Sequence, residues 1–153
     1  DTISCEEYGT RFTLFSVATV EVADSNACLI NSSPSGTDYL LWGMNTATFK
    51  RHYYLWNSPH ALADLLVQNT SFTQRLHASV TTPTTLNPYF NNTIQTVADR
   101  TGLVYGNTHF EIGSKGAGSL LDGTVQEILV YPSDKTSTLT DINTDINTHY
   151  SIY

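Results

Sequence analysis

The chain of 153 residues carries 14 acidic and 7 basic side chains, a formal net charge of −7 at pH 7. This balance argues against nucleic acid as a partner, because phosphate binding needs clustered Lys and Arg. Charged residues make up only 14% of the chain, against roughly 25% in an ordinary globular domain, and Thr, Ser and Asn fill the difference. Because Thr favours strands, the composition indicates an all-β domain with a polar, weakly charged surface.

The length suits a single domain spanning residues 1–153. No apolar run reaches the roughly 18 residues of a membrane span, so we expect no membrane insertion. The chain starts with Asp1 and has no signal peptide, which suggests a trimmed chain or the C-terminal piece of a longer protein. Cys5 and Cys28 are too few for a disulfide framework; they are expected to be two free thiols or one disulfide.

Turn-forming residues divide most of the chain into short β-rich runs. The expected strands are residues 12–22, 39–42, 48–56, 75–80, 89–90, 93–97, 109–112 and 124–131. The run 39–42 is continuously apolar, so it is expected to be buried on both faces. Asn91-Asn92 predicts a hairpin turn, because Asn tolerates positive φ. Strands at this spacing indicate a sandwich or a barrel.

Two segments have helical patterns. Residues 61–67 (ALADLLV) could form one or two helical turns. The stronger signal starts at Leu139: Leu139, Ile142, Ile146 and Tyr150 are spaced by three, four and four residues, which places them on one helix face. Thr138 with Asp141 three residues later matches a capping box.

Three segments together resemble concanavalin A-like lectin/glucanase (laminin G-like) domains. Residues 76–97 resemble the central hairpin of that family, with Tyr89-Phe90-Asn91-Asn92 where the family has Y-[VF]-N-G. HFEIG at 109–113 and LDGTVQEILVY at 121–131 are similar to its later strands. The resemblance covers residues 10–153 and implies an all-β jelly-roll sandwich of two antiparallel sheets with one C-terminal helix, as in many bacterial and phage members. The expected core is Phe12, Leu14, Leu40, Trp42, Leu76, Phe90, Ile112, Val125, Leu129 and Tyr131.

The distribution of carboxylates argues against a glycosidase. Such enzymes need two carboxylates roughly 5 to 9.5 Å apart, whereas Glu111 and Glu127 each stand alone on an expected strand. The glucanase signature E-[IL]-D-x-x-E is absent as well. No G-x-S-x-G motif occurs, and the five histidines are scattered singly. We therefore expect no catalytic residues and no transition-metal site.

No cofactor is expected, and calcium is the one ion that the sequence leaves open. Asp24, Asn26, Asp38 and Asp122 lie in expected turns and carry the hard oxygen ligands that Ca²⁺ prefers. No D-x-D-x-D-G loop is present, however, and isolated turn Asp and Asn residues usually cap their own backbone.

The segment RHYYLWNSPH at residues 51–60 is the richest candidate for ligand binding. Sugar recognition needs an aromatic platform for the apolar face of the ring, with polar groups nearby for its hydroxyls. Strand alternation puts Tyr54 and Trp56 on one face, and Asn57 and His60 follow directly. These four residues form the predicted ligand site; the alternative is that the aromatic side chains belong to the core.

These patterns predict a non-catalytic module that binds a glycan or a cell-surface receptor. It would be displayed on a virion, such as a phage, or on a secreted bacterial protein, so its location would be extracellular or on the virion surface. The alternative is a structural decoration or assembly module that docks on neighbouring subunits and has no ligand of its own. The acidic net charge favours neutral or basic ligands.

Overall fold

The computed structural model describes the backbone of residues 2–4, 11–20, 27–31, 39–45, 50–56, 61–65, 73–99, 101, 109–113 and 121–153. Side chains are described for residues 11–19, 29–30, 73–99, 101, 112–113 and 121–153. Cys5 lies outside the described residues, and the side chain of Cys28 does too, so the thiol prediction stays untested.

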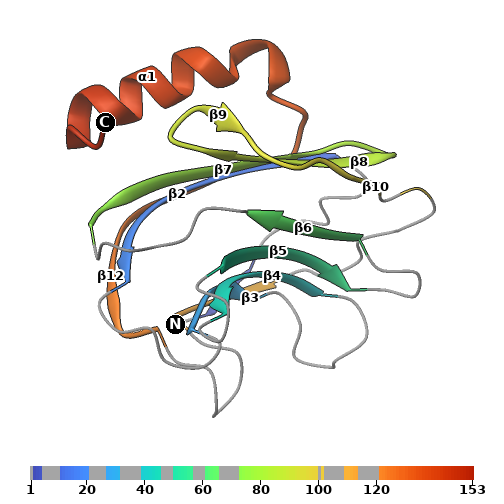
Figure 1. The fold of residues 1–153 in the computed structure, drawn as a ribbon, viewed down its shortest axis with the longest axis horizontal. Helices are drawn as coiled ribbons and strands as arrows, with labels where there is room; N and C mark the ends of the chain where they lie inside the picture. Colours follow the sequence, from blue (N-terminus) through green and yellow to red (C-terminus); the bar gives the residue numbers. More distant parts are fainter. Residues whose placement is uncertain are drawn as a thin grey trace.

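Two antiparallel sheets, A and B, face one another, and a C-terminal helix covers the outer face of sheet B (Figure 1). Sheet A contains, in spatial order, β1 (Thr2–Ser4), β11 (His109–Ile112), β3 (Ala27–Asn31), β4 (Tyr39–Asn45), β5 (Lys50–Trp56) and β6 (Ala61–Leu65). Sheet B contains β10 (Ala98–Asp99), β8 (Thr85–Phe90), β7 (Arg75–Thr81), β2 (Phe12–Val20) and β12 (Gly123–Tyr131), and β9 (Thr93–Ile94) pairs with β8. This is the jelly-roll sandwich that the sequence predicted.

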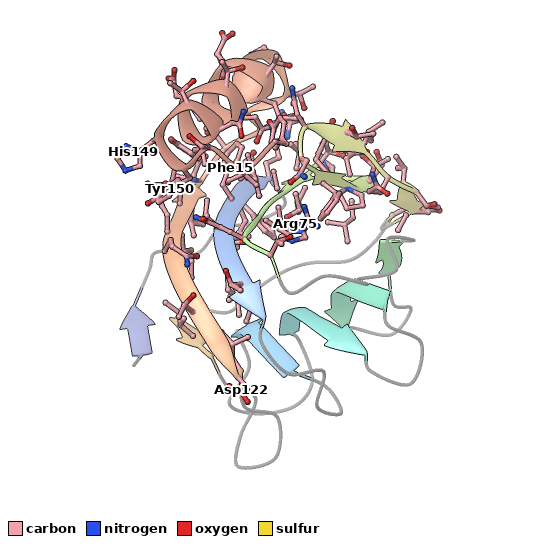
Figure 2. All side chains as sticks on the ribbon, turned by 60° about the vertical axis from the view of Figure 1, so that its left-hand side comes forward. Phe15, Arg75, Asp122, His149 and Tyr150 are labelled. Carbon is pink, nitrogen blue, oxygen red and sulfur yellow. The ribbon has the colours of Figure 1, made fainter. Side chains whose placement is uncertain are left out.

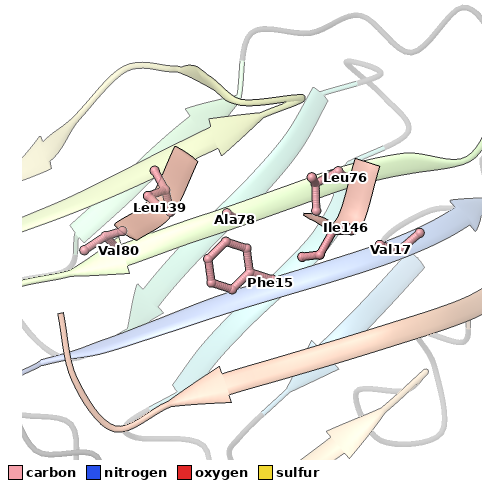
Figure 3. Packing of buried hydrophobic residues seen from close by; sticks show 7 residues of the cluster. All are labelled: Phe15, Val17, Leu76, Ala78, Val80, Leu139 and Ile146. Atoms are coloured by element: carbon pink, nitrogen blue, oxygen red, sulfur yellow. The ribbon is translucent and has the colours of Figure 1, made fainter. Parts of the chain in front are cut away.

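Strand β2 is buried on both faces, because each face meets a different layer. Its register with β7 places Phe12, Leu14 and Ser16 on the side towards sheet A. Phe15 and Val17 point the other way, towards the helix, and both are at most 1% exposed. The helix-side cluster is drawn in Figure 3 and consists of Phe15, Val17, Leu76, Ala78, Val80, Leu139 and Ile146. Sheet B therefore carries an apolar layer on its outer face as well.

Helix α1 (Leu139–Tyr150) confirms the spacing argument, since Leu139 and Ile146 are buried and Ile142 and Tyr150 partly so. The predicted capping box of Thr138 and Asp141 was wrong. The Thr138 side chain makes no capping hydrogen bond; its hydroxyl donates to the Lys135 carbonyl within the preceding 3₁₀ turn, η1 (Thr136–Thr138). The backbone of this 3₁₀ turn, and not a capping side chain, leads into the helix.

One amide side chain, that of Asn147, holds the residues that follow the end of α1. Ser151 adopts a left-handed conformation with φ of 53°, and its N–H donates to the Asn147 carbonyl at 2.7 Å. Asn147 Oδ1 accepts the N–H groups of Ile152 and Tyr153, both at 2.9 Å. The residues after α1 are thereby held against it.

The β8–β9 hairpin confirms the predicted Asn91-Asn92 turn, with φ values of 44° and 63°. Asn91 N–H donates to the Leu76 carbonyl at 3.0 Å, and Leu76 N–H donates to Asn91 Oδ1 at 3.3 Å. Asn92 Oδ1 accepts a hydrogen bond from Nδ2 of the fully buried Asn143 at 2.8 Å. The turn is thus bonded both to sheet B and to α1.

One element was predicted wrongly. The helical turns predicted for residues 61–67 are wrong over the described part of that segment: Ala61–Leu65 is strand β6, which pairs with β5 at one edge of sheet A. A five-residue apolar run is too short to be stable as a helix alone, so pairing with an existing strand decides its conformation. Strands β1, β3 and β10 were not predicted, because they are short and have no alternating pattern.

The expected core is only partly confirmed. Phe12, Leu14 and Leu76 are at most 1% exposed. The prediction was too strong for five others, which are partly buried: Phe90, Ile112, Val125, Leu129 and Tyr131. Three of these lie on β12, an edge strand of sheet B, so they have a neighbouring strand on one side only. The side chains of Leu40 and Trp42, and with them the burial of segment 39–42, lie outside the described residues.

Candidate functional site

The predicted sugar platform lies at the end of β5, between β4 and β6. Tyr54 is opposite Leu41 and Leu62 in register, and Trp56 is opposite Tyr39. Alternate positions of one strand share a face, so the backbone places positions 54 and 56 together as expected. Asn57, His60 and the side chains of Tyr54 and Trp56 lie outside the described residues, and their role stays a prediction.

A groove that the sequence did not predict runs between α1 and β12. Its volume is about 380 Å³, which falls within the range of small-ligand pockets. Strand β12 contributes three lining residues and α1 the other five: Glu127, Leu129, Tyr131, Ile142, Asp145, Ile146, His149 and Tyr150. We call this the α1–β12 groove.

Strand alternation and helical spacing bring these side chains together. A register shift between Val125 and Glu127 turns Glu127, Leu129 and Tyr131 to the side of β12 that faces α1. From the helix, Ile142 and Ile146 supply an apolar floor. Figure 2 shows His149 and Tyr150, in the last turn of α1, close to β12. The groove therefore has an apolar base and a polar rim.

Two tyrosines give the groove aromatic character. Tyr131 makes an edge-to-face contact with Phe15, with ring centroids 6.0 Å apart, and Lys135 Nζ lies 5.1 Å from the Tyr131 ring centroid. The His149 ring meets Tyr150 edge-on at 4.6 Å. These contacts fix the ring positions, because each ring is held by a neighbour.

The charge of the groove is negative. Loss of hydration raises the pKa of Tyr150, and the adjacent Glu127 carboxylate adds to the rise by its charge and by accepting a hydrogen bond. Asp145 adds a second carboxylate to the rim. Neither β12 nor α1 contains a Lys or Arg, and His149 is the one residue of the two elements that can become cationic.

Sequence reasoning gave Glu127 no role beyond that of a lone strand carboxylate. Asp145 and His149 are four residues apart on α1, on the same side as Ile142 and Ile146. That spacing was the available signal: polar residues bordering the apolar stripe of an amphipathic helix. It could not identify the strand on which the helix packs, and so could not bring in Glu127.

A second polar feature lies on the inner face of sheet B. Every inward position of β7 is polar, and three of them are fully buried: His77, Ser79 and Thr81. Ser16, opposite His77 on β2, is fully buried too. Among the described residues, the hydroxyls of Ser16, Ser79 and Thr81 have no hydrogen-bond partner. The side of the sandwich interior formed by β7 is therefore polar.

No metal centre occurs among the residues that the structure describes: no three His, Cys, Asp or Glu side chains gather there. Of the residues considered for calcium, Asp122 is exposed, and Asp24, Asn26 and Asp38 lie outside the described ranges. Within those ranges no helix is long and apolar enough to cross a membrane.

Solved structures match the fold over nearly the whole chain. Domain 4 of AbnA, a GH43 extracellular arabinanase from Geobacillus stearothermophilus, in complex with arabinotriose, superposes with a TM-score of 0.75 at 13% identity, covering 93% of this chain and 72% of the other. The binding domain of botulinum neurotoxin DC in complex with SialylT gives 0.73 at 10% identity, with 96% and 38% covered. The Ruminococcus gnavus IT-sialidase CBM40 bound to α2,3-sialyllactose gives 0.71 at 11% identity, with 94% and 96% covered.

The chain thus has the concanavalin A-like jelly-roll fold of lectin-type domains, as its motifs indicated. No protein-family model matches the sequence, and no curated protein is similar to it. Identities of 10–13% to these structures establish a shared fold, and a shared fold does not fix a function.

Proposed function

We propose that this protein is a non-catalytic glycan-binding module. The observation that carries the proposal is the match to three domains whose structures contain arabinotriose, SialylT or sialyllactose, over 93–96% of this chain. The module would act from the surface of a virion or of a secreted bacterial protein, where it meets host or environmental glycans.

The proposed sugar platform is the end of β5, with Tyr54 and Trp56 stacking on a ring and Asn57 and His60 binding its hydroxyls. The register supports this, since positions 54 and 56 fall on one face of β5. Aromatic rings remove the apolar face of a sugar from water, and polar neighbours then orient it. With a net charge of −7, the module would favour neutral or basic glycans, because acidic ones are repelled.

Glycan-array binding of a multivalent display of the protein tests this proposal, because single lectin-type sites are weak and many copies act together. Trp56→Ala should abolish binding and leave the melting transition in place. The matched control is Tyr153→Ala, which removes an aromatic ring that is 51% exposed and should bind like the wild type. Binding by Trp56→Ala at wild-type strength would refute the platform. Loss of its melting transition would show that Trp56 belongs to the core.

Reducing-sugar release from laminarin tests the non-catalytic part. Wild-type protein should release none, since the sequence lacks the glucanase signature E-[IL]-D-x-x-E. Release that disappears in Glu127→Gln would show that the protein is a hydrolase. If no array glycan binds and the protein instead assembles on neighbouring subunits, the structural role is the correct one.

A further inference from the structure

We propose that the α1–β12 groove is a second binding site, which takes the ammonium group of a small organic cation. The site is separate from the β5 platform, and this proposal does not depend on the glycan-binding proposal. Three features of the groove carry it: the carboxylates on its rim, the aromatic rings in its wall, and its place at the C-terminal end of α1.

The carboxylates on the rim give the groove negative charge. Glu127 approaches from β12 and Asp145 from α1, so an ammonium group in the groove would lie between two negative side chains. The Lys135 ammonium lies beside the groove, with its Nζ over the Tyr131 ring. Lys135 is not among the lining residues. A cation in the groove would meet two carboxylates and no Lys or Arg among the residues that line it, and attraction across such a concave surface is stronger than on open surface.

The helix adds to this field. Four of the five lining residues of α1 belong to its second half, and His149 and Tyr150 are its last two residues. Unpaired carbonyls at a helix C-terminus carry a partial negative charge and favour cations within the last turn. Part of this charge is relieved by the Ser151 N–H, which donates to the Asn147 carbonyl. The remaining partial charge has the same sign as the two carboxylates.

The aromatic and apolar walls select an organic cation over a metal ion. Tyr150 presents ring surface, which attracts ammonium groups by cation–π interaction, and the Lys135 ammonium over Tyr131 is a contact of this kind in the same wall. Leu129, Ile142 and Ile146 can cover the alkyl or ring carbons that carry the charge. Ca²⁺ and Mg²⁺ need six or more oxygen ligands, and no metal-binding group of three occurs among the described residues. The chemistry of the groove thus fits an alkylammonium or an amino sugar.

NMR titration of the Ile142 and Ile146 methyl groups at low salt tests the site, with two matched pairs of probes. Choline is compared with its neutral isostere 3,3-dimethylbutanol, and D-glucosamine with neutral N-acetylglucosamine. We expect saturable shifts with the cations and at least about tenfold weaker binding of the neutral partners, the change for one lost charge-assisted contact. Binding of both cations indicates a general ammonium site, and binding of glucosamine alone indicates an amino-sugar site.

The variants separate the groove from the overall charge. Glu127→Gln and Asp145→Asn should each weaken choline or glucosamine binding by about tenfold. Asp141→Asn is the control: it removes the same charge one turn earlier on α1, outside the groove, and should bind like the wild type. Tyr150→Leu should weaken binding while Tyr150→Phe, which keeps the ring, should not. Each variant is first shown to melt like the wild type.

Equal binding of cations and neutral isosteres would overturn the proposal, as would no saturable shift at all. It would fail too if Asp141→Asn weakened binding as much as Asp145→Asn, since the attraction would then come from net charge. Trp56→Ala should leave cation binding unchanged, and Glu127→Gln should leave the binding of neutral glycans unchanged. These two crossed measurements distinguish failure of this site from failure of the β5 platform.

Discussion

Truncating Ile146 should detach α1 from sheet B. Ile146 is 6% exposed and packs in the cluster that includes Phe15, Val17 and Leu76. Ile146→Ala removes three carbons from this contact, and we expect it to lower the free energy of unfolding by about 2–4 kcal/mol. Ile146→Val removes one carbon and should cost about 0.5–1.5 kcal/mol. The graded pair separates loss of packing from a general disturbance of the helix.

Thermal and urea unfolding measure the effect. At about 2–4 °C per kcal/mol for a chain of this size, Ile146→Ala should lower Tm by about 4–16 °C. Thr148→Ala is the matched control, because Thr148 lies on the same helix and is exposed. It should change the stability by less than about 0.5 kcal/mol. An unchanged melting curve for Ile146→Ala would refute the packing described here and would mean that α1 is not docked on sheet B in solution.

Three further changes test the hairpin and an acidic turn. Asn92→Gly accommodates the positive φ of 63° but removes the acceptor for the buried Asn143 Nδ2; urea unfolding should show a loss of about 1–3 kcal/mol. Asn92→Asp keeps an acceptor and should stay closer to the wild type, so equal losses in both variants would contradict this role. Hydrogen bonds from the Thr136 hydroxyl and N–H lower the pKa of Asp134 below 3.8, so its stabilising contribution is present above pH 5 or so and lost as the pH falls through the folded pKa. Asp134→Asn should therefore lose less stability than the wild type on acidification; parallel pH curves for Asp134→Asn and the wild type would contradict the assignment.

Local patterns predicted the elements that depend on neighbouring residues in the sequence. The helix stripe from Leu139 to Tyr150 follows from spacing alone, and the turn at Asn91-Asn92 follows from the tolerance of Asn for positive φ. The helix prediction for residues 61–67 was wrong over Ala61–Leu65, because Ala and Leu favour a helix locally while the edge of β5 offers strand pairing. That pairing depends on β5, and the composition of the segment itself does not reveal it.

Burial on the outer face of sheet B could not be predicted from alternation. Phe15 and Val17 of β2, and Ala78 and Val80 of β7, were left out of the expected core, yet all are at most 1% exposed. An alternating strand predicts one buried face, and the second is buried here because α1 covers it. The α1–β12 groove was missed for the same reason, since it exists only where a helix and an edge strand from separate parts of the sequence meet.

The connectivity of sheet B has a consequence for the synthesis of the chain. Strand β2 pairs with β7 and with β12, whose residues follow it by about sixty and more than a hundred positions. Its two apolar faces are therefore without all of their partners until β12 and α1, more than a hundred residues later, have left the ribosome. Such non-local pairing makes folding slow and exposes strand edges meanwhile. Deleting α1 should accordingly reduce the soluble yield during expression more than an equal number of changes at exposed positions of the same helix.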